Sequence, residues 1–232
     1  MPFLSSAGDV NELYLGSEGV ELDEANPDNR FRLEWLAAVG NLLDDVAAEP
    51  SKPLVITATG KFFSNGLDTD YIAANASGLP RYLDRVHELY VKVLTLPVPT
   101  AVAINGHAFG AGAMLALCTD VRVMRSDRGF WSLPEAALGM PFTRGMASLL
   151  RTRLSDPTAT TAMLTSHRYG GAEAAAAGIV SEAVDADQLR SRAAELLAER
   201  APLAGPNLGA IKRGLRQPLI ADLETETPAS LL

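Results

Sequence analysis

The sequence contains a single cysteine, Cys118, which excludes an intramolecular disulfide. It has no apolar run that approaches the ~20 residues needed to cross a bilayer as a helix. The first ten residues, MPFLSSAGDV, lack the basic and apolar segments of a secretory signal. From these absences we expect a protein of the reducing cytoplasm with no membrane partner. Cys118 lies in an apolar run, which predicts a small buried hydrophobe rather than a nucleophile.

Positive charge is in the minority, since 20 Lys and Arg residues face 28 Asp and Glu residues and the formal net charge is −8. Nucleic acids attract basic surfaces, so this balance argues against a nucleic-acid-binding protein. An anionic ligand would have to be bound by a local group of basic residues. The hydrophobic fraction of 47% and the charged fraction of 21% indicate an ordered globular protein. Its 232 residues allow one large domain, or a core with an appendage.

The stretch from Leu96 to Gly139 carries the most informative pattern. Within it, Thr100–Ile104 is short, apolar and preceded by prolines, which predicts a buried strand. The tripeptide Gly110-Ala111-Gly112 then leads into Ala113–Leu117, which is apolar on all sides and predicts a buried helix. Small residues at this helix start let a ligand approach the backbone. Its unpaired N–H groups would suit a negative charge that develops on an oxygen atom.

A lone carboxylate follows in Pro134-Glu135, inside an otherwise apolar segment from Leu133 to Met140. A carboxyl group in apolar surroundings, together with an anion-stabilising helix start, is suited to proton transfer beside a carbonyl. Each signal alone has a plainer interpretation. The small tripeptide is also typical of close packing, and a glutamate after a proline is typical of the first turn of a surface helix.

The remaining segments predict an α/β fold with buried strands, because strand and helix patterns alternate. The expected strands lie at 11–15, 20–22, 54–57, 100–104 and 121–124, the first two joined as a hairpin through 16–19. The segment 59–68 is expected to be a loop. Up to residue 145 the expected helices lie at 33–47, 83–94 and 113–117. Beyond it only helices are expected, at 146–154, 158–164, 172–177, 187–200 and 208–215, followed by a frayed tail from 224.

Three motifs carry a family resemblance: TATGKFFSNGLD at 57–68, LPVPTAVAINGHAFGAGAMLALCTD at 96–120 and DRGFWSLPEAALGM at 127–140. Weaker matches lie at 166–184 and 210–215. With these motifs the chain resembles the enoyl-CoA hydratase/isomerase (crotonase) superfamily over nearly its whole length, and is most similar to monofunctional Δ3,Δ2-enoyl-CoA isomerases. The resemblance implies a crotonase-type spiral of ββα repeats at 1–165. It also implies a C-terminal helical region at 166–232 that builds a homotrimer or a dimer of trimers.

The resemblance assigns catalytic roles to three positions. The backbone N–H groups of Leu67 and Ala111 would form an oxyanion hole for the thioester carbonyl, although Ala111 stands where the family usually has glycine. Glu135 would be an acid/base residue. The family's other acid/base position is occupied by Met114. Hydration uses two carboxylates to hold water, whereas a 1,3-proton shift needs one, so Met114 favours an isomerase over a hydratase.

The resemblance also predicts how the coenzyme A part of an acyl-CoA thioester is bound, with no metal and no separate cofactor. The loop around Lys61–Leu67 is similar to the family's adenine-binding segment. Arg30 and Lys61 would contact phosphates, and Lys212 is a weaker choice; any of the three could equally be a solvated surface charge. The expected substrate-binding residues are Arg30, Lys61, Phe63, Ser64, Gly66 and Met114.

Three other polar residues have chemistry that suits a site. His107 could be a base, but a structural or solvent-facing histidine is more typical of this position. Asp68 and Asp120 are expected to cap backbone groups.

The sequence therefore predicts an enzyme that moves a double bond from C3 to C2 of an acyl-CoA through an enolate. Two alternatives stay open. One is an enoyl-CoA hydratase, or another lyase of the same superfamily, that pairs Glu135 with a second group. The other is a non-catalytic acyl-CoA-binding member.

Overall fold

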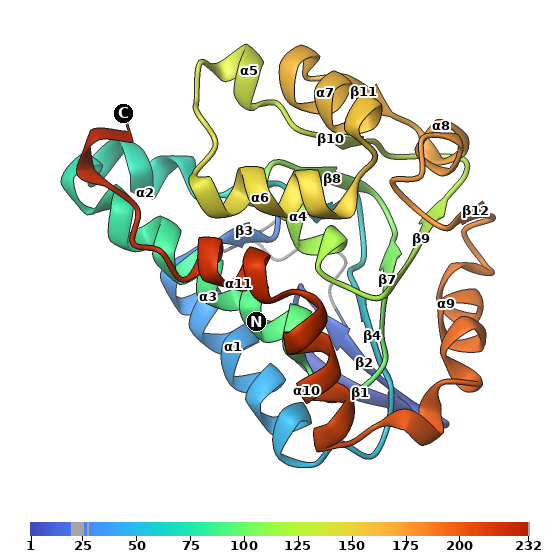
Figure 1. The fold of residues 1–232 in the computed structure, drawn as a ribbon. Helices are drawn as coiled ribbons and strands as arrows, with labels where there is room; N and C mark the ends of the chain where they lie inside the picture. Colours follow the sequence, from blue (N-terminus) through green and yellow to red (C-terminus); the bar gives the residue numbers. More distant parts are fainter. Residues whose placement is uncertain (20–25, 27, 232) are drawn as a thin grey trace.

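The computed structural model describes residues 1–19, 26 and 28–231. A six-stranded sheet runs through the molecule (Figure 1), with the strand order β1-β2-β4-β7-β9-β12. Its strands are β1 (Phe3–Ala7), β2 (Val10–Tyr14), β4 (Leu54–Thr57), β7 (Thr100–Ile104), β9 (Val121–Arg125) and β12 (Glu182–Val184). Only β1 and β2 pair antiparallel, and the other neighbours are parallel. The central strands β4 and β7, which have parallel partners on both sides, are buried at every residue, as their sequences predicted.

Different helices cover the two faces of this sheet, because alternate residues of each strand point to opposite sides. Leu54 and Ile56 join a large core with α1 (Leu33–Ala48) and α3 (Leu79–Thr95). Val55 joins a smaller core with α9 (Leu189–Ala198), which lies along the opposite side of the sheet in Figure 1.

Two smaller sheets carry the motifs. The four-stranded sheet has the order β11-β10-β8-β5, with β11 (Arg168–Tyr169), β10 (Trp131–Ser132), β8 (His107–Phe109) and β5 (Phe62–Ser64). A two-stranded sheet pairs β3 (Arg30–Phe31) with β6 (Gly66–Leu67) in parallel. The neighbours β8 and β10 run parallel and lead into α4 (Ala111–Leu117) and α5 (Glu135–Leu138), respectively. The four-stranded sheet therefore brings the starts of these two helices to one edge.

The other helices surround the sheets; in Figure 1, α2 lies at the left, α7 at the top, α8 at the right and α10 at the bottom. They are α2 (Thr69–Ala74), α6 (Arg144–Arg153), α7 (Asp156–Thr165), α8 (Gly171–Ala176), α10 (Pro206–Leu215) and α11 (Gln217–Leu223). None of the helices in the described ranges is both long and apolar enough to span a bilayer.

Several sequence expectations are confirmed, among them the α/β fold class. The strands at 54–57 and 100–104 have the expected bounds, and each expected helix is present within a few residues of its predicted ends. Cys118 is buried, its Sγ lies 3.4 Å from the carbonyl oxygen of Met114, and burial raises the pKa of its thiol to about 12. It is the inert hydrophobe that the sequence predicted.

The strand expected at 20–22, and with it the hairpin through 16–19, lies outside the described residues. Three local expectations are wrong. The loop at 59–68 contains β5 and β6. The chain after Gly145 is not purely helical, because β11 and β12 add short strands to the edges of the two larger sheets. The tail is anchored, since the backbone N–H of Thr227 donates to Asp84 Oδ1 at 2.9 Å. The division at 165/166 stays a prediction.

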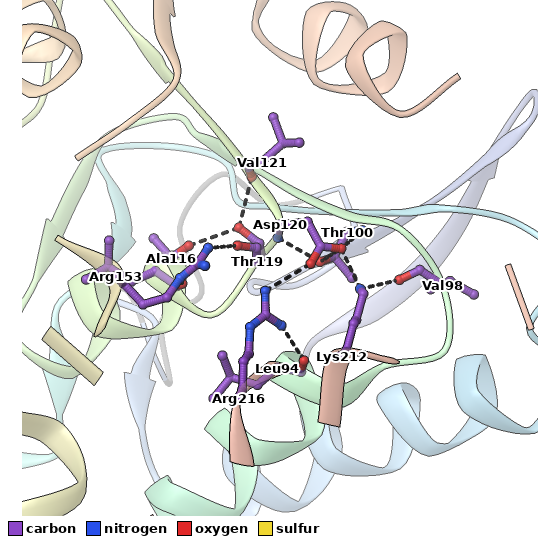
Figure 2. A network of polar contacts seen from close by, with 11 residues as sticks. Leu94, Val98, Thr100, Ala116, Thr119, Asp120, Val121, Arg153, Lys212 and Arg216 are labelled. Atoms are coloured by element: carbon purple, nitrogen blue, oxygen red, sulfur yellow. Dashed lines mark hydrogen bonds and ion pairs between the residues drawn. The ribbon is translucent and has the colours of Figure 1, made fainter. Parts of the chain in front are cut away.

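A buried ion-pair network attaches α10 to the core (Figure 2). Asp120 accepts hydrogen bonds from the Thr100 backbone N–H at 2.9 Å, the Thr100 hydroxyl at 3.0 Å and Arg216 at 3.2 Å, and it also pairs with Lys212. Lys212 donates further to the carbonyl of Val98 at 2.7 Å. Burial alone would raise the pKa of Asp120, but Lys212, Thr100 and Arg216 outweigh it and lower that pKa. One carboxylate thus pairs with two buried cations, Lys212 in α10 and Arg216 between α10 and α11.

Replacing Asp120 by asparagine should lower the free energy of unfolding by about 3–5 kcal/mol, because Lys212 and Arg216 would remain buried without their counter-charge. Urea unfolding measures this difference. The matched control is Asp127→Asn, which removes a more exposed partner of Arg125 and should have a much smaller effect. Equal effects of the two substitutions would contradict the anchoring role of Asp120.

Candidate active site

The first turn of α4 is held in an unusual backbone conformation. Gly110 precedes it with φ +51°, a region that residues with a Cβ rarely occupy. The N–H of Gly110 donates to the carbonyl of Ser132 in β10 at 3.0 Å, and its carbonyl accepts from Met114 at 3.0 Å. As the first residue of the helix, Ala111 has an N–H group with no carbonyl partner inside the helix. This donor is available to a ligand that approaches the helix start.

Gly66 in β6 lies directly against the start of α4. A methyl group added at Gly66 would lie 2.7 Å from the carbonyl oxygen of Phe109 and 2.9 Å from the backbone nitrogen of Ala111. Real Cβ atoms do not approach other atoms so closely, and the φ of Gly66 is also positive, at +82°. Only glycine therefore allows β6 and α4 to meet here.

The residues on either side of Leu67 hold its backbone against β3. The Gly66 N–H donates to the hydroxyl of Ser64 at 3.1 Å, and the Asp68 N–H donates to the hydroxyl of Tyr82 at 2.8 Å. Both of these hydroxyls in turn donate to carbonyls of the chain at 29–31, so both N–H groups point toward β3. The Leu67 N–H lies between these two bonded groups, and Leu67 directly follows Gly66, which lies against the backbone nitrogen of Ala111. The backbone around Leu67 is thereby held close to the start of α4.

Glu135, the first residue of α5, completes this group. A methyl group added at Gly110 would lie 3.1 Å from Glu135 Oε1, so the carboxylate lies beside the residue that precedes Ala111. The residue as a whole is partly exposed, but Oε2 is buried and has no hydrogen-bond partner among the described residues. Burial raises the pKa of Glu135 to about 7, against a smaller lowering by its own backbone N–H. A carboxyl group with this pKa can accept and return a proton near neutral pH.

Both ends of the short helix α5 are fixed. It follows β10 through the fully buried Leu133, and it ends at Gly139 in the left-handed region with φ +68°. Ser166, at the end of α7, accepts a hydrogen bond from the Ala137 N–H at 3.1 Å and another from Ser132 at 3.2 Å. The Glu135 carboxylate therefore lies on a short helix that is held in place by β10 and by the end of α7.

Met114 is 1% exposed and lies one helical turn after Ala111. It belongs to the large core together with Ala111 and Ala113. The position that the resemblance assigns to a second acid/base residue is thus filled by a buried thioether, which accepts hydrogen bonds only weakly.

The residues expected to bind substrate include two buried side chains, Phe63 and Ser64, and two basic ones, Arg30 and Lys61. Phe63 and Ser64 have 0% exposed area, and a methyl group at Gly112 would lie 2.6 Å from Ser64 Cβ, so these side chains support the loop from within. Arg30 lies 3.4 Å from both Asp28 and Asp70 in ion pairs. The exposed Lys61 places its ammonium group 5.3 Å from the centre of the Phe62 ring. Of these side chains, Lys61 is the one best placed to reach a phosphate from the surface.

Two further expectations are settled by side-chain contacts. Lys212 as a phosphate ligand is wrong, because it is 5% exposed and bound to Asp120 (Figure 2). Asp68 acts as a cap, since it accepts from the Tyr71 N–H at 3.3 Å at the start of α2.

His107 packs among the rings of Phe62, Phe109 and Phe130, with centroid distances of 5.4, 5.0 and 5.6 Å. Burial lowers the pKa of His107, and the cations Lys61, Arg168 and Arg128 lower it further. These three ring contacts indicate a structural role for His107.

Sequence reasoning missed two residues that hold the site, Tyr82 and Tyr90 of α3. The Tyr90 hydroxyl donates to the carbonyl of Ala111 at 2.8 Å, and Tyr82 contacts Asp68 as described above. Tyr90 lies in the helix expected at 83–94, whereas Tyr82 lies just before its expected start. A buried tyrosine needs a partner for its hydroxyl, and that requirement was the available signal.

A separate groove of about 700 Å³ lies between α1 and α3 and is lined by residues that include Leu36, Gly40 and Leu89. None of Leu67, Ala111 and Glu135 lines it. The candidate site is therefore identified by its chemical groups, the backbone N–H at the start of α4 and the Glu135 carboxylate, and not by the volume of a groove.

The chain belongs to the enoyl-CoA hydratase/isomerase family, because the sequence model of that family matches residues 18–228. Its relatives include both reaction types. It is 33% identical over 189 residues to enoyl-CoA delta isomerase 2, peroxisomal, of Arabidopsis thaliana, which covers 78% of this chain and 75% of that protein. It is 32% identical over 194 residues to the 2,3-dehydroadipyl-CoA hydratase of Escherichia coli K12, which covers 82% of this chain and 74% of that protein.

Solved structures confirm the crotonase fold. A probable enoyl-CoA hydratase from Mycobacterium tuberculosis H37Rv superposes with a TM-score of 0.84 at 24% identity, over 96% of this chain and 91% of that chain. An enoyl-CoA hydratase/isomerase family protein from Pseudomonas syringae superposes with a TM-score of 0.81 at 23% identity, over 95% and 92% of the two chains. At this identity the likeness establishes the fold alone.

The raised pKa of Glu135 predicts a pH-dependent contribution to stability. A glutamate titrates near 4.5 when unfolded and at about 7 here, so the folded state binds the proton more tightly. This contribution is full below pH 4.5 and is lost as the pH rises through 7. The free energy of unfolding of the wild type minus that of Glu135→Gln should therefore fall between about pH 5 and pH 8. Denaturant titrations measure it, and a constant difference would contradict the assignment.

Proposed function

We propose that this protein is a Δ3,Δ2-enoyl-CoA isomerase. The observation that carries the proposal is the asymmetry of the site: one carboxylate, Glu135, lies beside Gly110, while the position of a second is filled by the buried Met114. A 1,3-proton shift needs one base that acts twice. Addition of water needs groups that hold and activate the water. The Arabidopsis relative, named as an enoyl-CoA delta isomerase, supports the same choice.

In the proposed reaction the thioester oxygen accepts hydrogen bonds from the N–H groups of Leu67 and Ala111. The α-proton of a thioester is a weak acid, so its removal requires stabilisation of the enolate oxygen. Loss of one such donor typically costs about 3–4 kcal/mol of transition-state stabilisation. Backbone donors suit this task because their side chains are not used, which explains why Leu67 and Ala111 can both be apolar.

Glu135 would take a proton from C2 of the 3-enoyl-CoA, which forms the enolate. The electron pair then returns from the enolate oxygen, the double bond moves to C2, and C4 receives the proton from the same carboxyl group. No atom is gained or lost, so the reaction needs no redox cofactor or co-substrate. A pKa of about 7 lets Glu135 serve as base in the first step and as acid in the second.

The coenzyme A part of the substrate is proposed to lie along the segment from Lys61 to Leu67. Lys61 is proposed as the phosphate contact, because its ammonium group is exposed at the surface. We propose the cytoplasm as the compartment, although the Arabidopsis relative is named as peroxisomal.

A hydratase is the second candidate, because the Escherichia coli relative is named as one. It would require a group besides Glu135 that holds water near C3. A non-catalytic acyl-CoA-binding protein is the third candidate, which the retained carboxylate disfavours. A spectroscopic assay with 3-enoyl-CoA and 2-enoyl-CoA separates the three. Isomerisation without hydration supports the proposal, hydration supports the second candidate, and binding without turnover supports the third.

Glu135→Gln should keep the fold and acyl-CoA binding while isomerisation falls steeply. The exchange is nearly isosteric and removes only the base, and acid/base groups contribute about 10²–10⁴-fold in rate. Steady-state kinetics and binding by calorimetry measure the two effects. Near wild-type turnover would show that the base is elsewhere.

Met114→Glu should introduce measurable hydration of 2-enoyl-CoA and reduce isomerisation. A carboxylate at this position could hold a water molecule with Glu135, which a thioether cannot do. The protein should also become less stable by several kcal/mol, because the new charge enters a buried position. Met114→Gln, which adds polarity without a base, is the control. Efficient hydration by the wild type would show that Met114 does not set the reaction type.

We also propose that the chain forms a homotrimer or a dimer of trimers through its C-terminal helices. Support comes from α10, which turns the charged Lys212 inward and leaves Ile211 57% and Leu215 75% exposed. An isolated chain would hold these apolar side chains in water. Sedimentation at micromolar concentration should give a trimer or a hexamer, and a monomer would contradict this proposal.

A further inference from the structure

Two tyrosines of one helix hold the two walls of the candidate oxyanion hole. Tyr82 and Tyr90 lie eight positions apart on α3 and are 2% and 0% exposed. A helix of this length is a rigid rod on the scale of a site, and eight residues correspond to about 12 Å along its axis. Each hydroxyl binds the backbone next to a different donor residue.

Tyr82 binds the wall that contains Leu67. Its hydroxyl accepts a hydrogen bond from the Asp68 N–H at 2.8 Å and donates to the carbonyl of Phe31 at 2.8 Å. Phe31 is also the register partner of Leu67 in the pair of β3 and β6. One hydroxyl therefore bridges both strands at the level of the proposed donor, and fixes the peptide that follows Leu67.

Tyr90 binds the wall that contains Ala111. Its hydroxyl donates to the Ala111 carbonyl at 2.8 Å, in the peptide that follows the second proposed donor. The same carbonyl is positioned to accept from Leu115 inside α4, so Tyr90 is an additional partner and not a replacement for the helical bond. Burial raises the pKa of Tyr90, and the nearby Cys118 and Glu135 raise it further, so the hydroxyl remains a donor.

We infer that Tyr82 and Tyr90 are positioning residues, and that α3 acts through them to set the separation between the N–H groups of Leu67 and Ala111. The inference rests on the proposed function, because it assigns both N–H groups to one substrate oxygen. Neither tyrosine touches the substrate. The two hydroxyls are carried by one rigid helix, so the walls cannot shift independently. A displacement of about 1 Å at such a site can cost about 10²-fold in rate.

The test compares three Tyr→Phe substitutions, each of which removes one hydroxyl and keeps the ring. Tyr82→Phe and Tyr90→Phe remove the proposed positioning bonds. Tyr14→Phe is the matched control: the Tyr14 hydroxyl donates to Glu12 at 2.7 Å and accepts from Arg190 at 2.6 Å, outside the site. Thermal unfolding checks that each variant is folded. Should Tyr82→Phe fail to fold, Tyr90→Phe carries the test, since Ala111 keeps its helical partner.

Two readouts separate positioning from general stabilisation. The first is the division between kcat and KM with 3-enoyl-CoA: kcat should fall by about 10–10²-fold in Tyr82→Phe and Tyr90→Phe while KM changes less than about 3-fold. The second is the infrared stretch of a ¹³C-labelled thioester carbonyl in bound saturated acyl-CoA. The hydrogen-bonded carbonyl should absorb at lower frequency in the wild type and in Tyr14→Phe, and shift toward its free frequency in the other two variants.

The inference is overturned if Tyr90→Phe, folded and able to bind acyl-CoA, keeps the wild-type kcat or the wild-type carbonyl frequency. It is also overturned if the wild type binds no acyl-CoA, because there would then be no oxyanion to position. Binding without turnover by the wild type has a different meaning. It would refute the proposed isomerase, and the carbonyl frequencies of the variants would still decide the role of the two tyrosines.

Discussion

The close approach of Gly66 to the first residue of α4 is the constraint on which the site depends. A single methyl group at Gly66 would lie 2.9 Å from the Ala111 nitrogen, so the two backbone segments are in contact with no side chain between them. This contact brings together the backbones of Leu67 and Ala111, which are far apart in the sequence. The left-handed Gly110 then aims the helix start and leaves room for the Glu135 carboxylate. The backbone arrangement of the site thus depends on two glycines, Gly66 and Gly110, and the Glu135 carboxylate lies beside the second of them.

The core around this contact is unusual because it contains charges. Asp120 pairs with two buried cations, Lys212 of α10 and Arg216 just after it, and Arg153 donates to the carbonyls of Leu117 and Thr119 at 2.8 and 2.7 Å, where α4 ends. The start of α4 therefore faces the site, while its end is fixed by charged side chains (Figure 2). On α10 itself, Lys212 faces inward, whereas Ile211 and Leu215 are exposed.

Sequence patterns predicted the parts of the fold that bury continuous apolar surface. The strands β4 and β7 are mostly apolar and buried at every residue, and their bounds are as expected. Strands of two or three residues, such as β11 and β12, are too short to show a periodicity in the sequence, and they form because a neighbouring strand pairs with them. In the site, the spacing of Gly110 and Glu135 was visible, and the structure brings them together. The inward orientation of Lys212 and the hydrogen-bond partners of Tyr82 and Tyr90 could not be predicted, because they depend on contacts between distant parts of the sequence.

The central claim is that one carboxylate, Glu135, moves a single proton from C2 to C4 of the substrate. Its most direct test is a single turnover, in ordinary water, of 3-enoyl-CoA that carries two deuterium atoms at C2. Glu135 Oε2 is buried, so a deuteron held by this carboxyl should be delivered in part to C4 before it exchanges with solvent. Mass spectrometry of the 2-enoyl-CoA product should therefore find deuterium at C4. A product with no deuterium at C4, or a 3-hydroxyacyl-CoA product, would contradict the account.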